Sequence, residues 1–384
     1  MKLAETIINL VLSINLRNFD QGKVSDIRMD LDIKRVLNYI DSRLGFSLIT
    51  PINLAEENKK LENAIIKGTV YNPVYTYANT DTLDFEYMSK ILNTLQFEDT
   101  VIGNLYKQLC IQKQYEVDLY RKIGNAKEFT QASQKVYGLP DETLREECFR
   151  ILNLETKQEK ANYTANDLKQ KFEETLQKYT LGYWDVIITD RIGSKVMVGQ
   201  EKIWINSNYT FSENDMKRLC AHEILTHVLR YENGKLRGNS IFSDGTSCSM
   251  DTEEGLAIYN EERANALNLH MLKTYAARYL CTLSMNDQSL YELVMMIKDY
   301  VGLQQAIYIA SRIKVGLCDT QAGGGFNKDF IYLQGYYTIK QAVQADSSVY
   351  SQLYYGRIAV KDLNILRPII QQEINKNNII LPTL

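Results

Sequence analysis

The pattern of apolar positions predicts helices over much of the first 152 residues. Apolar residues recur at helical spacing near the N-terminus, at Ile33, Val36, Leu37, Ile40 and Leu44. Gly45 follows them as a helix stop. Similar spacing returns in the segments 88–95, 101–120 and 132–137. Asp141 can cap a further helix that reaches about residue 152. We therefore expect residues 1–70 to form a mixed N-terminal extension and residues 71–160 a helical support region.

The period then changes from helical to strand-like. Thr164 to Asp167 resembles a capping box and predicts a helix that ends near Gly182. Alternating apolar residues next predict three short strands, at 184–189, 194–199 and 202–206. We expect them to form a small antiparallel sheet. An edge strand of such a sheet can pair with the extended backbone of a peptide.

A second capping-box pattern, Ser212 to Asp215, predicts the start of the next helix. Asn233 and Gly234 predict its end, and residues 234–252 read as a long surface loop because they are rich in Gly, Ser and Asn. Thr252 is expected to cap a helix that has Glu253 and Glu254 in its first turn.

The remaining chain is predicted to be helical at 256–285, 289–313 and 326–343. Three glycines at 323–325 open a turn. No Lys-Ser/Thr pair follows them, which argues against a phosphate-binding loop. With the sheet, these helices give an α+β, mostly helical fold class, and residues 161–384 form the expected catalytic core.

Composition limits the classes of binding partner and the cellular compartments that can be expected. The chain has 384 residues, 45% of them hydrophobic, and a net charge of -3. No basic surplus indicates a nucleic-acid or anionic-membrane partner. The six cysteines form no CxxC pair, which favours free thiols in a reducing compartment. No signal peptide and no run of about 18 apolar residues is found, so a cytoplasmic location without membrane insertion is expected.

The candidate chemistry centres on two of the three histidines in the sequence. His222 and His227 lie on the helix that follows the predicted sheet, and Glu223 follows the first of them. A catalytic zinc ion takes three protein ligands and keeps one open position. Both histidines and one downstream carboxylate, Glu253 or Glu254, would supply three ligands. Glu223 would then be the general base.

The spacing of the histidines departs from the usual HExxH pattern. Five positions correspond to about 140° around a regular helix, and two side chains so far apart do not converge on one ion. A π-turn would bring residues i and i+5 into line. We therefore predict a wide turn between His222 and His227. With a regular helix there, the pair would be unrelated surface histidines. The third histidine, His270, is interpreted as an unrelated core or surface residue.

These residues resemble a known family. The segment from His222 to Arg230, with Asn233, is similar to the HExxTHxxR...N signature of the microtubule-associated tyrosine carboxypeptidases. It is also similar to their bacterial relatives, the flavohaemoglobin-expression-modulating QEGLA-motif proteins. Residues 253–257 stand where the family has (Q/E)EGLA, and residues 326–335 resemble its F-x-K-D-x-x-Y-L-x-G block. The resemblance covers residues 70 to 345.

The resemblance implies a zincin-like metallopeptidase domain in which His222, His227 and Glu254 hold zinc and Glu223 is catalytic. A carboxypeptidase that acts on the C-terminus of a peptide or protein follows as the expected activity. Arg230 and Lys328 are candidates for holding the terminal carboxylate. Arg230 could equally form a structural salt bridge. Tyr332 completes the expected substrate-binding residues.

Two points limit what the resemblance transfers. Eukaryotic members remove a C-terminal tyrosine from tubulin, but no basic tail or patch in this sequence suggests docking to an acidic microtubule surface. Leu225 replaces a glycine of many relatives and adds bulk beside the site. The alternative function is a non-catalytic zinc-fold regulatory or binding protein. The presence of Glu223 argues against it, because a structural zinc needs no general base.

Overall fold

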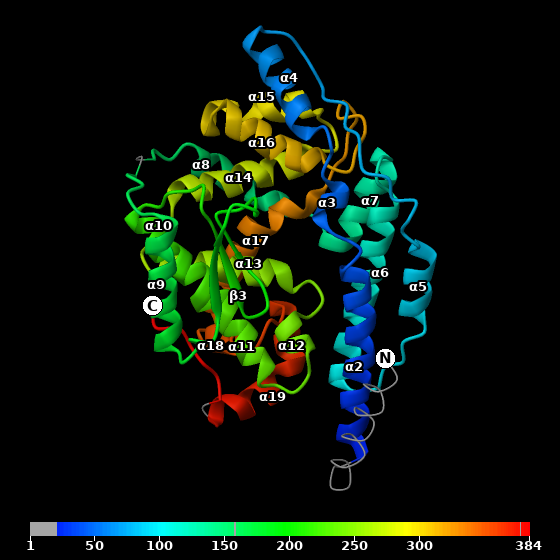
Figure 1. Ribbon diagram of the computed structural model, residues 1–384, viewed down its shortest axis with the longest axis vertical. Coiled ribbons are helices and arrows are strands. Elements are labelled where there is room, and N and C mark those ends of the chain that lie inside the picture. Colours follow the sequence, from blue (N-terminus) through cyan, green and yellow to red (C-terminus); the bar gives the residue numbers. More distant parts are fainter. Residues whose placement is uncertain (1–20, 157–158, 377) are drawn as a thin grey trace.

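The computed structural model describes residues 21–156, 159–376 and 378–384, and most of its elements are helices (Figure 1). The first part of the chain forms α2 (Gln21–Asp41), α3 (Phe46–Ile49), α4 (Leu54–Ile66), α5 (Phe85–Asn93), α6 (Val101–Arg121), α7 (Ala126–Tyr137), the short 3-10 helix η2 (Glu142–Leu144) and α8 (Arg145–Leu152). Figure 1 shows α2, α5, α6 and α7 on one side of the molecule, apart from the sheet and the helices around it.

The central part of the chain forms α9 (Ala165–Lys178), β1 (Asp185–Thr189), β2 (Val196–Val198), β3 (Lys202–Asn206), α10 (Glu213–Leu219), the π-helix η3 (Cys220–Val228), α11 (Leu229–Lys235), α12 (Ile241–Asp244) and α13 (Ser249–Arg263). The last part forms α14 (Leu269–Ser284), α15 (Leu290–Val301), α16 (Leu303–Lys314), η4 (Asn327–Phe330), α17 (Ile331–Ala345), α18 (Ser348–Leu353), η5 (Val360–Asp362) and α19 (Leu363–Asn375). No described helix has the length and apolar character needed to cross a membrane.

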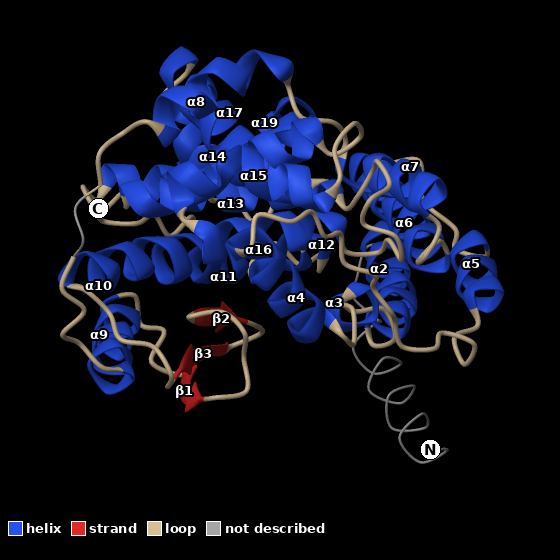
Figure 2. Cartoon of the chain, turned by 90° about the horizontal axis from the view of Figure 1, so that it is seen from above, coloured by secondary structure: helices blue, strands red, loops and turns tan. Residues whose placement is uncertain are grey.

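The three strands lie at one edge of the helical body (Figure 2) and form a mixed sheet of order β1-β3-β2. The strand positions were predicted correctly, but the purely antiparallel sheet was wrong. β2 runs antiparallel to β3, whereas β1 runs parallel to β3. The connection after β1 reverses direction before β2, and Asn206 of β3 donates a hydrogen bond to the carbonyl of Ile192 in that connection. Alternation of apolar residues indicates which face is buried, not which neighbour a strand takes.

Two helix starts were predicted correctly from their capping boxes. Thr164 and Asp167 cap α9 reciprocally, and Ser212 and Asp215 do the same for α10. In each pair the first side chain accepts from the backbone of the second, and the second accepts from the backbone of the first. The second box fixes the direction of the helix that carries His222.

The segment 234–252 was wrongly predicted to be a surface loop. Helix α11 continues through Asn233 and Gly234 to Lys235, and α12 then folds back so that Ile241 and Phe242 are buried. A Cβ on Gly234 would lie 2.0 Å from the carbonyl oxygen of Phe242, so this glycine permits close packing and does not end the helix. Ser243, one of the residues that indicated a loop, is buried and donates from its hydroxyl to the carbonyl of Ser240.

The helix expected to begin at Thr252 begins earlier. Helix α13 starts at Ser249, which places Glu253 and Glu254 in its second turn. The Thr252 hydroxyl accepts a hydrogen bond from the backbone of Val360 instead of capping the helix. The predicted helix at 289–313 is likewise two helices, α15 and α16, separated at Gly302.

Helices α13 and α17 cross at a pair of glycines. A Cβ on Gly255 would lie 2.2 Å from the backbone carbon of Gly335, and a Cβ on Gly335 would lie 2.0 Å from the carbonyl oxygen of Asp251. The two backbones therefore touch directly, with no side chain between them. This contact explains the glycines of the EGLA segment and of the Tyr-Leu-Gln-Gly segment. It brings α17 and the preceding η4 beside the carboxylates of α13.

Replacing Gly255 by alanine is expected to lower the free energy of unfolding by about 1–3 kcal/mol, because the new methyl group meets backbone that cannot rotate away. Chemical denaturation measures this change. Gly193→Ala is the control, since nothing lies within 4 Å of a Cβ at that position. Equal stability of both variants would contradict the close crossing of α13 and α17.

Candidate functional site

The two histidines of the sequence motif lie on a wide helical turn. Residues Cys220–Val228 form the π-helix η3, as the five-residue spacing predicted. His222 and His227 therefore point to the same side, and their ring centroids are 4.9 Å apart. The wide turn between the histidines is confirmed.

Buried side chains hold this turn in place. Thr226 donates from its hydroxyl to the carbonyl of Ala221 at 2.8 Å, and Tyr354 donates to the carbonyl of Leu225 at 2.7 Å. The amide nitrogen of Asn260 donates to both hydroxyls at 2.7 Å. A π-turn departs from the usual i→i−4 hydrogen bonding of a helix. These side chains give two carbonyls of the turn hydrogen-bond partners away from water.

One face of α13 is directed at η3. Positions 253, 254, 260 and 261 fall within an arc of about 120° on a regular helix, while Gly255 lies on the other side. From this face Glu254 Oε2 lies 3.6 Å from His222 Nε2. Of the two carboxylates of the EGLA segment, Glu254 is the one near this ring nitrogen, while Glu253 contacts His227 Nδ1.

The other two carboxylates of this face orient the histidines. Glu261 Oε1 lies 2.8 Å from His222 Nδ1, and Glu253 Oε1 lies 2.9 Å from His227 Nδ1. A carboxylate oxygen accepts, so each Nδ1 is the donor in its pair, while Nε2 of His222 faces Glu254. Carboxylates behind the histidines are the usual support of metal-binding imidazoles. Sequence reasoning missed Glu261, although its position seven residues after Glu254 places both on one helix face.

Each orienting carboxylate is paired with a buried arginine. Arg218 Nη1 lies 3.1 Å from Glu261 Oε1, and Arg230 Nη1 donates to Glu253 Oε2. Burial by itself would raise the pKa of Glu253. The charges of Arg230 and Arg357, together with the hydrogen bond from His227, instead hold that pKa far below its usual range. The carboxylate behind His227 is therefore ionised.

His222 and Glu254 also shift one another. Burial by itself would lower the pKa of His222, but hydrogen bonds with Glu254 and Glu261 raise it to about 10. Burial would raise the pKa of Glu254, and the hydrogen bond with His222 and the charge of His227 lower it. The two pKa shifts share one cause, because each group stabilises the charged form of the other.

Ligand atoms of the kinds that zinc takes lie close together here. Among the described residues, ligand atoms of His222, Glu223 and His227 lie within 4.8 Å of one another. Glu254 does not belong to that group, although it approaches His222 more closely than that limit. Zinc bonds of about 2.1 Å place tetrahedral ligands about 3.4 Å apart. The 3.6 Å from Glu254 Oε2 to His222 Nε2 is close to that value. Both Glu223 and Glu254 therefore lie close enough to the histidines to be considered as the third donor.

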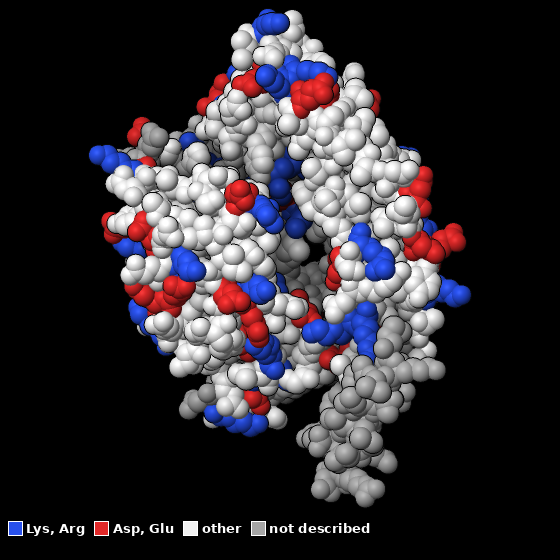
Figure 3. Space-filling model, viewed as in Figure 1, with Lys and Arg blue, Asp and Glu red and all other residues white. Residues whose placement is uncertain are grey.

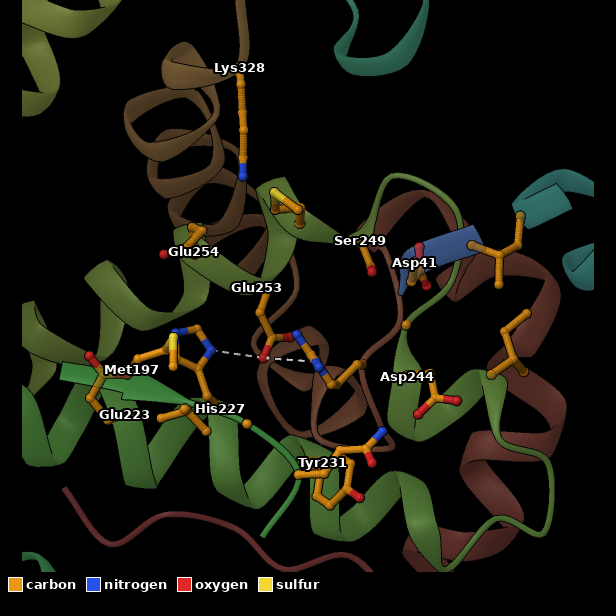
Figure 4. A pocket seen from close by; sticks show the side chains of 18 of the residues that line it. Asp41, Met197, Glu223, His227, Tyr231, Asp244, Ser249, Glu253, Glu254 and Lys328 are labelled. Atoms are coloured by element: carbon orange, nitrogen blue, oxygen red, sulfur yellow. Dashed lines mark hydrogen bonds and ion pairs between the residues drawn. The ribbon is translucent and has the colours of Figure 1, made fainter. Parts of the chain in front are cut away.

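A cavity of about 720 Å³ opens over these groups. Figure 3 shows a hollow between the two groups of helices, with basic side chains inside it. Glu223, His227 and Glu254 line one part of the cavity, together with Met197 of β2 (Figure 4). Lys328 of η4 points toward Glu254 in the same view. The predicted metal and substrate groups therefore share one cavity, with the exception of Arg230.

Lys328 and Tyr332 line the cavity from η4 and α17. Within the described part of the chain the Lys328 ammonium forms no ion pair, and burial lowers its pKa against the opposing charges of Asp329 and Glu254. The Tyr332 ring stacks on Tyr275 with centroids 5.3 Å apart. The charge of Glu254 and burial raise the pKa of Tyr332 well above its usual value. Its hydroxyl therefore stays protonated and can donate.

Arg230 is not in the cavity. Its side chain is fully buried and donates to the carbonyls of Leu353, Gly356 and Ile358 as well as to Glu253. Of the two roles considered for it, the structural salt bridge fits these contacts. Arg357 lines the cavity instead, with Nε 3.4 Å from Glu253 Oε1 and a side chain 36% exposed. No spacing in the sequence indicated Arg357. His270 is exposed at the start of α14, away from the cavity lining.

Comparison with known proteins gives one family match. The sequence model of the family described as microtubule-associated tyrosine carboxypeptidase matches residues 66–383. No curated protein matches the chain. The match includes η3, α13, η4 and α17, which carry the residues described above, and it begins after α2.

The hydrogen bonds that support η3 can be tested at Tyr354. Tyr354→Phe removes the donor to the Leu225 carbonyl and is expected to cost about 1–3 kcal/mol of unfolding free energy, because that carbonyl is buried. Tyr355→Phe is the matched control, since no hydrogen bond to its hydroxyl is seen in the described chain. If urea denaturation shows the same small loss for both, the hydroxyl of Tyr354 does not stabilise the turn.

Proposed function

The chain belongs to the microtubule-associated tyrosine carboxypeptidase family, and from this we propose that it is a zinc-dependent carboxypeptidase acting on the C-terminus of a peptide or protein. The observation that carries the proposal is the convergence of ligand atoms of His222, Glu223 and His227 in one cavity, where Glu254 Oε2 lies 3.6 Å from His222 Nε2. Three ligands that leave one position open are typical of hydrolytic zinc sites.

In this proposal His222 and His227 would hold zinc through Nε2, and Glu254 would hold it through its carboxylate. When bound, zinc supplies a Lewis acid that polarises the scissile carbonyl and makes water more acidic. Glu223 accepts a proton from the attacking water as its oxygen bonds to the carbonyl carbon. Glu223 then gives the proton to the leaving amine as the carbon–nitrogen bond breaks. A binding protein that keeps a structural zinc would need no such base.

Lys328 is the proposed partner of the terminal carboxylate, because its ammonium faces the cavity and has no ion pair in the described chain. Tyr332 donates from its protonated hydroxyl to the same end of the substrate or to the oxyanion that forms during attack. β2 is an edge of the sheet, and Val196, Met197 and Val198 line the cavity. The preceding residues of a substrate can add to this edge as an extended strand.

The roles of the two carboxylates are separable by one pair of substitutions. Glu223→Gln is expected to keep zinc but to lose about 10²–10⁴-fold of turnover, because only the general base is removed. Glu254→Gln is expected to lose bound zinc together with activity. Bound zinc is measured by elemental analysis, and cleavage by mass spectrometry of a diverse peptide library.

Glu262→Gln is the control for this pair, since Glu262 lies on α13 and pairs with Lys340 outside the cavity. If the unaltered protein cuts peptides internally, the proposed carboxypeptidase activity is wrong and only a peptidase activity in general is supported. If Glu254→Gln keeps zinc and Glu223→Gln loses it, then Glu223 is the third ligand and Glu254 is the general base. Bound zinc without any cleavage would favour the binding protein.

The orienting role of Glu261 predicts a loss of metal affinity. Glu261→Gln is expected to weaken zinc binding by about 10–100-fold, because a ligand histidine loses its charged acceptor. Competition with a coloured chelator measures the affinity. Glu232→Gln is the control, as this buried carboxylate pairs with Lys235 and contacts neither histidine. An equal loss in the two variants would point to general destabilisation instead.

A further inference from the structure

The cavity has a wall that the family match does not include. Lys34, Leu37, Asn38 and Asp41 of α2 line it, and all four precede residue 66, where the match begins. In Figure 4, Asp41 lies together with Asp244 and Ser249 on the side of the cavity opposite Met197 and Glu223. The helix α2 therefore borders the space into which a substrate would extend beyond the metal site.

This wall is a packed element and not a loose tail. Ile33 and Ile40 of α2 are 1% and 0% exposed, and both belong to the apolar cluster that contains Tyr106 of α6 and Val228 of η3. Burial of two isoleucines contributes several kcal/mol, at about 1.5–3 kcal/mol for each side chain. The position of α2 is thus fixed by the same core that supports the histidine-bearing turn.

Polar contacts then join α2 to the segment around α12. Asp30 accepts hydrogen bonds from the backbone nitrogen and the hydroxyl of Ser240, both at 2.8 Å. The hydroxyl of Tyr106 donates to Asp30 and accepts from the backbone nitrogen of Ile241 at 3.1 Å. These bonds hold α2, one wall of the cavity, at a fixed separation from the segment around α12, which forms the other wall.

One ion pair crosses between the two walls. Lys34 Nζ lies 3.1 Å from Asp244 Oδ2, and both residues line the cavity. The two side chains are 35% and 33% exposed, so the pair contributes only about 0–1 kcal/mol to stability. Its position matters more than its energy, because both side chains line the cavity and the pair joins α2 to α12 there.

We propose that the Lys34–Asp244 pair is a stop that closes this end of the cavity, so that a polypeptide reaches the metal site only with its C-terminal end. This inference rests on the proposed peptidase function and adds the structural basis of cleavage at the chain end. A substrate lying along β2 crosses the metal site and ends before the pair. An internal segment would have to continue through the space that the two side chains fill.

The test compares a linear peptide with a head-to-tail cyclic peptide of the same sequence, which has no chain end. The unaltered protein should cleave only the linear peptide. Lys34→Ser combined with Asp244→Ser shortens both side chains and should raise the rate of internal cleavage by about tenfold or more. Lys34→Asp alone should also open the passage, because two carboxylates repel.

Combining Lys34→Asp with Asp244→Lys rebuilds the pair and should restore cleavage at the end only. Arg35→Ser is the control on the same helix, since its side chain is 72% exposed and does not line the cavity. If the variants without the ion pair still cleave only the linear peptide at its end, the proposed stop is wrong, but the proposed peptidase function stands. Cleavage of the cyclic peptide by the unaltered protein leads to the same conclusion. No cleavage of either peptide by any form overturns the proposed function, and this inference with it.

Discussion

The close packing of α13 on two sides is the constraint on which the rest of the site depends. One side presents Glu253, Glu254, Asn260 and Glu261 to the wide turn η3. The other side meets α17 through Gly255 with no side chain between the backbones. A helical period of about 3.6 residues allows both contacts to come from a few turns of chain. The EGLA segment therefore combines chemistry with packing.

The carboxylates that accept from the two histidines have their negative charge balanced by arginines and not by the histidines themselves. Arg218 pairs with the carboxylate that orients His222, and Arg230 pairs with the one that orients His227. An unpaired carboxylate at this depth would be expensive to bury. The two arginines allow carboxylate acceptors to stand directly behind both imidazoles. Arg230, expected from the sequence to meet either the substrate or another side chain, belongs to this supporting layer.

The sequence predicted local features well where a residue pattern has one physical meaning. Two reciprocal capping boxes and the five-residue histidine spacing gave correct helix starts and a correct wide turn. Features decided by tertiary contacts were missed. Gly234 is typical of a helix end, yet here it makes room for the Phe242 backbone. The direction of β1 and the position of Arg357 likewise depend on neighbours far away in the chain, which local patterns do not encode.

The glycine crossing has a mechanical consequence. Side chains between helices can change rotamer and absorb small displacements, but two backbones in direct contact cannot. Gly255 and Gly335 therefore make α13 and α17 one rigid body. That body carries Glu254 on one helix and Tyr332 on the other, while His222 and His227 belong to η3. A shift of the α17 backbone at Tyr332 would therefore be expected to move the α13 backbone at Glu254 with it.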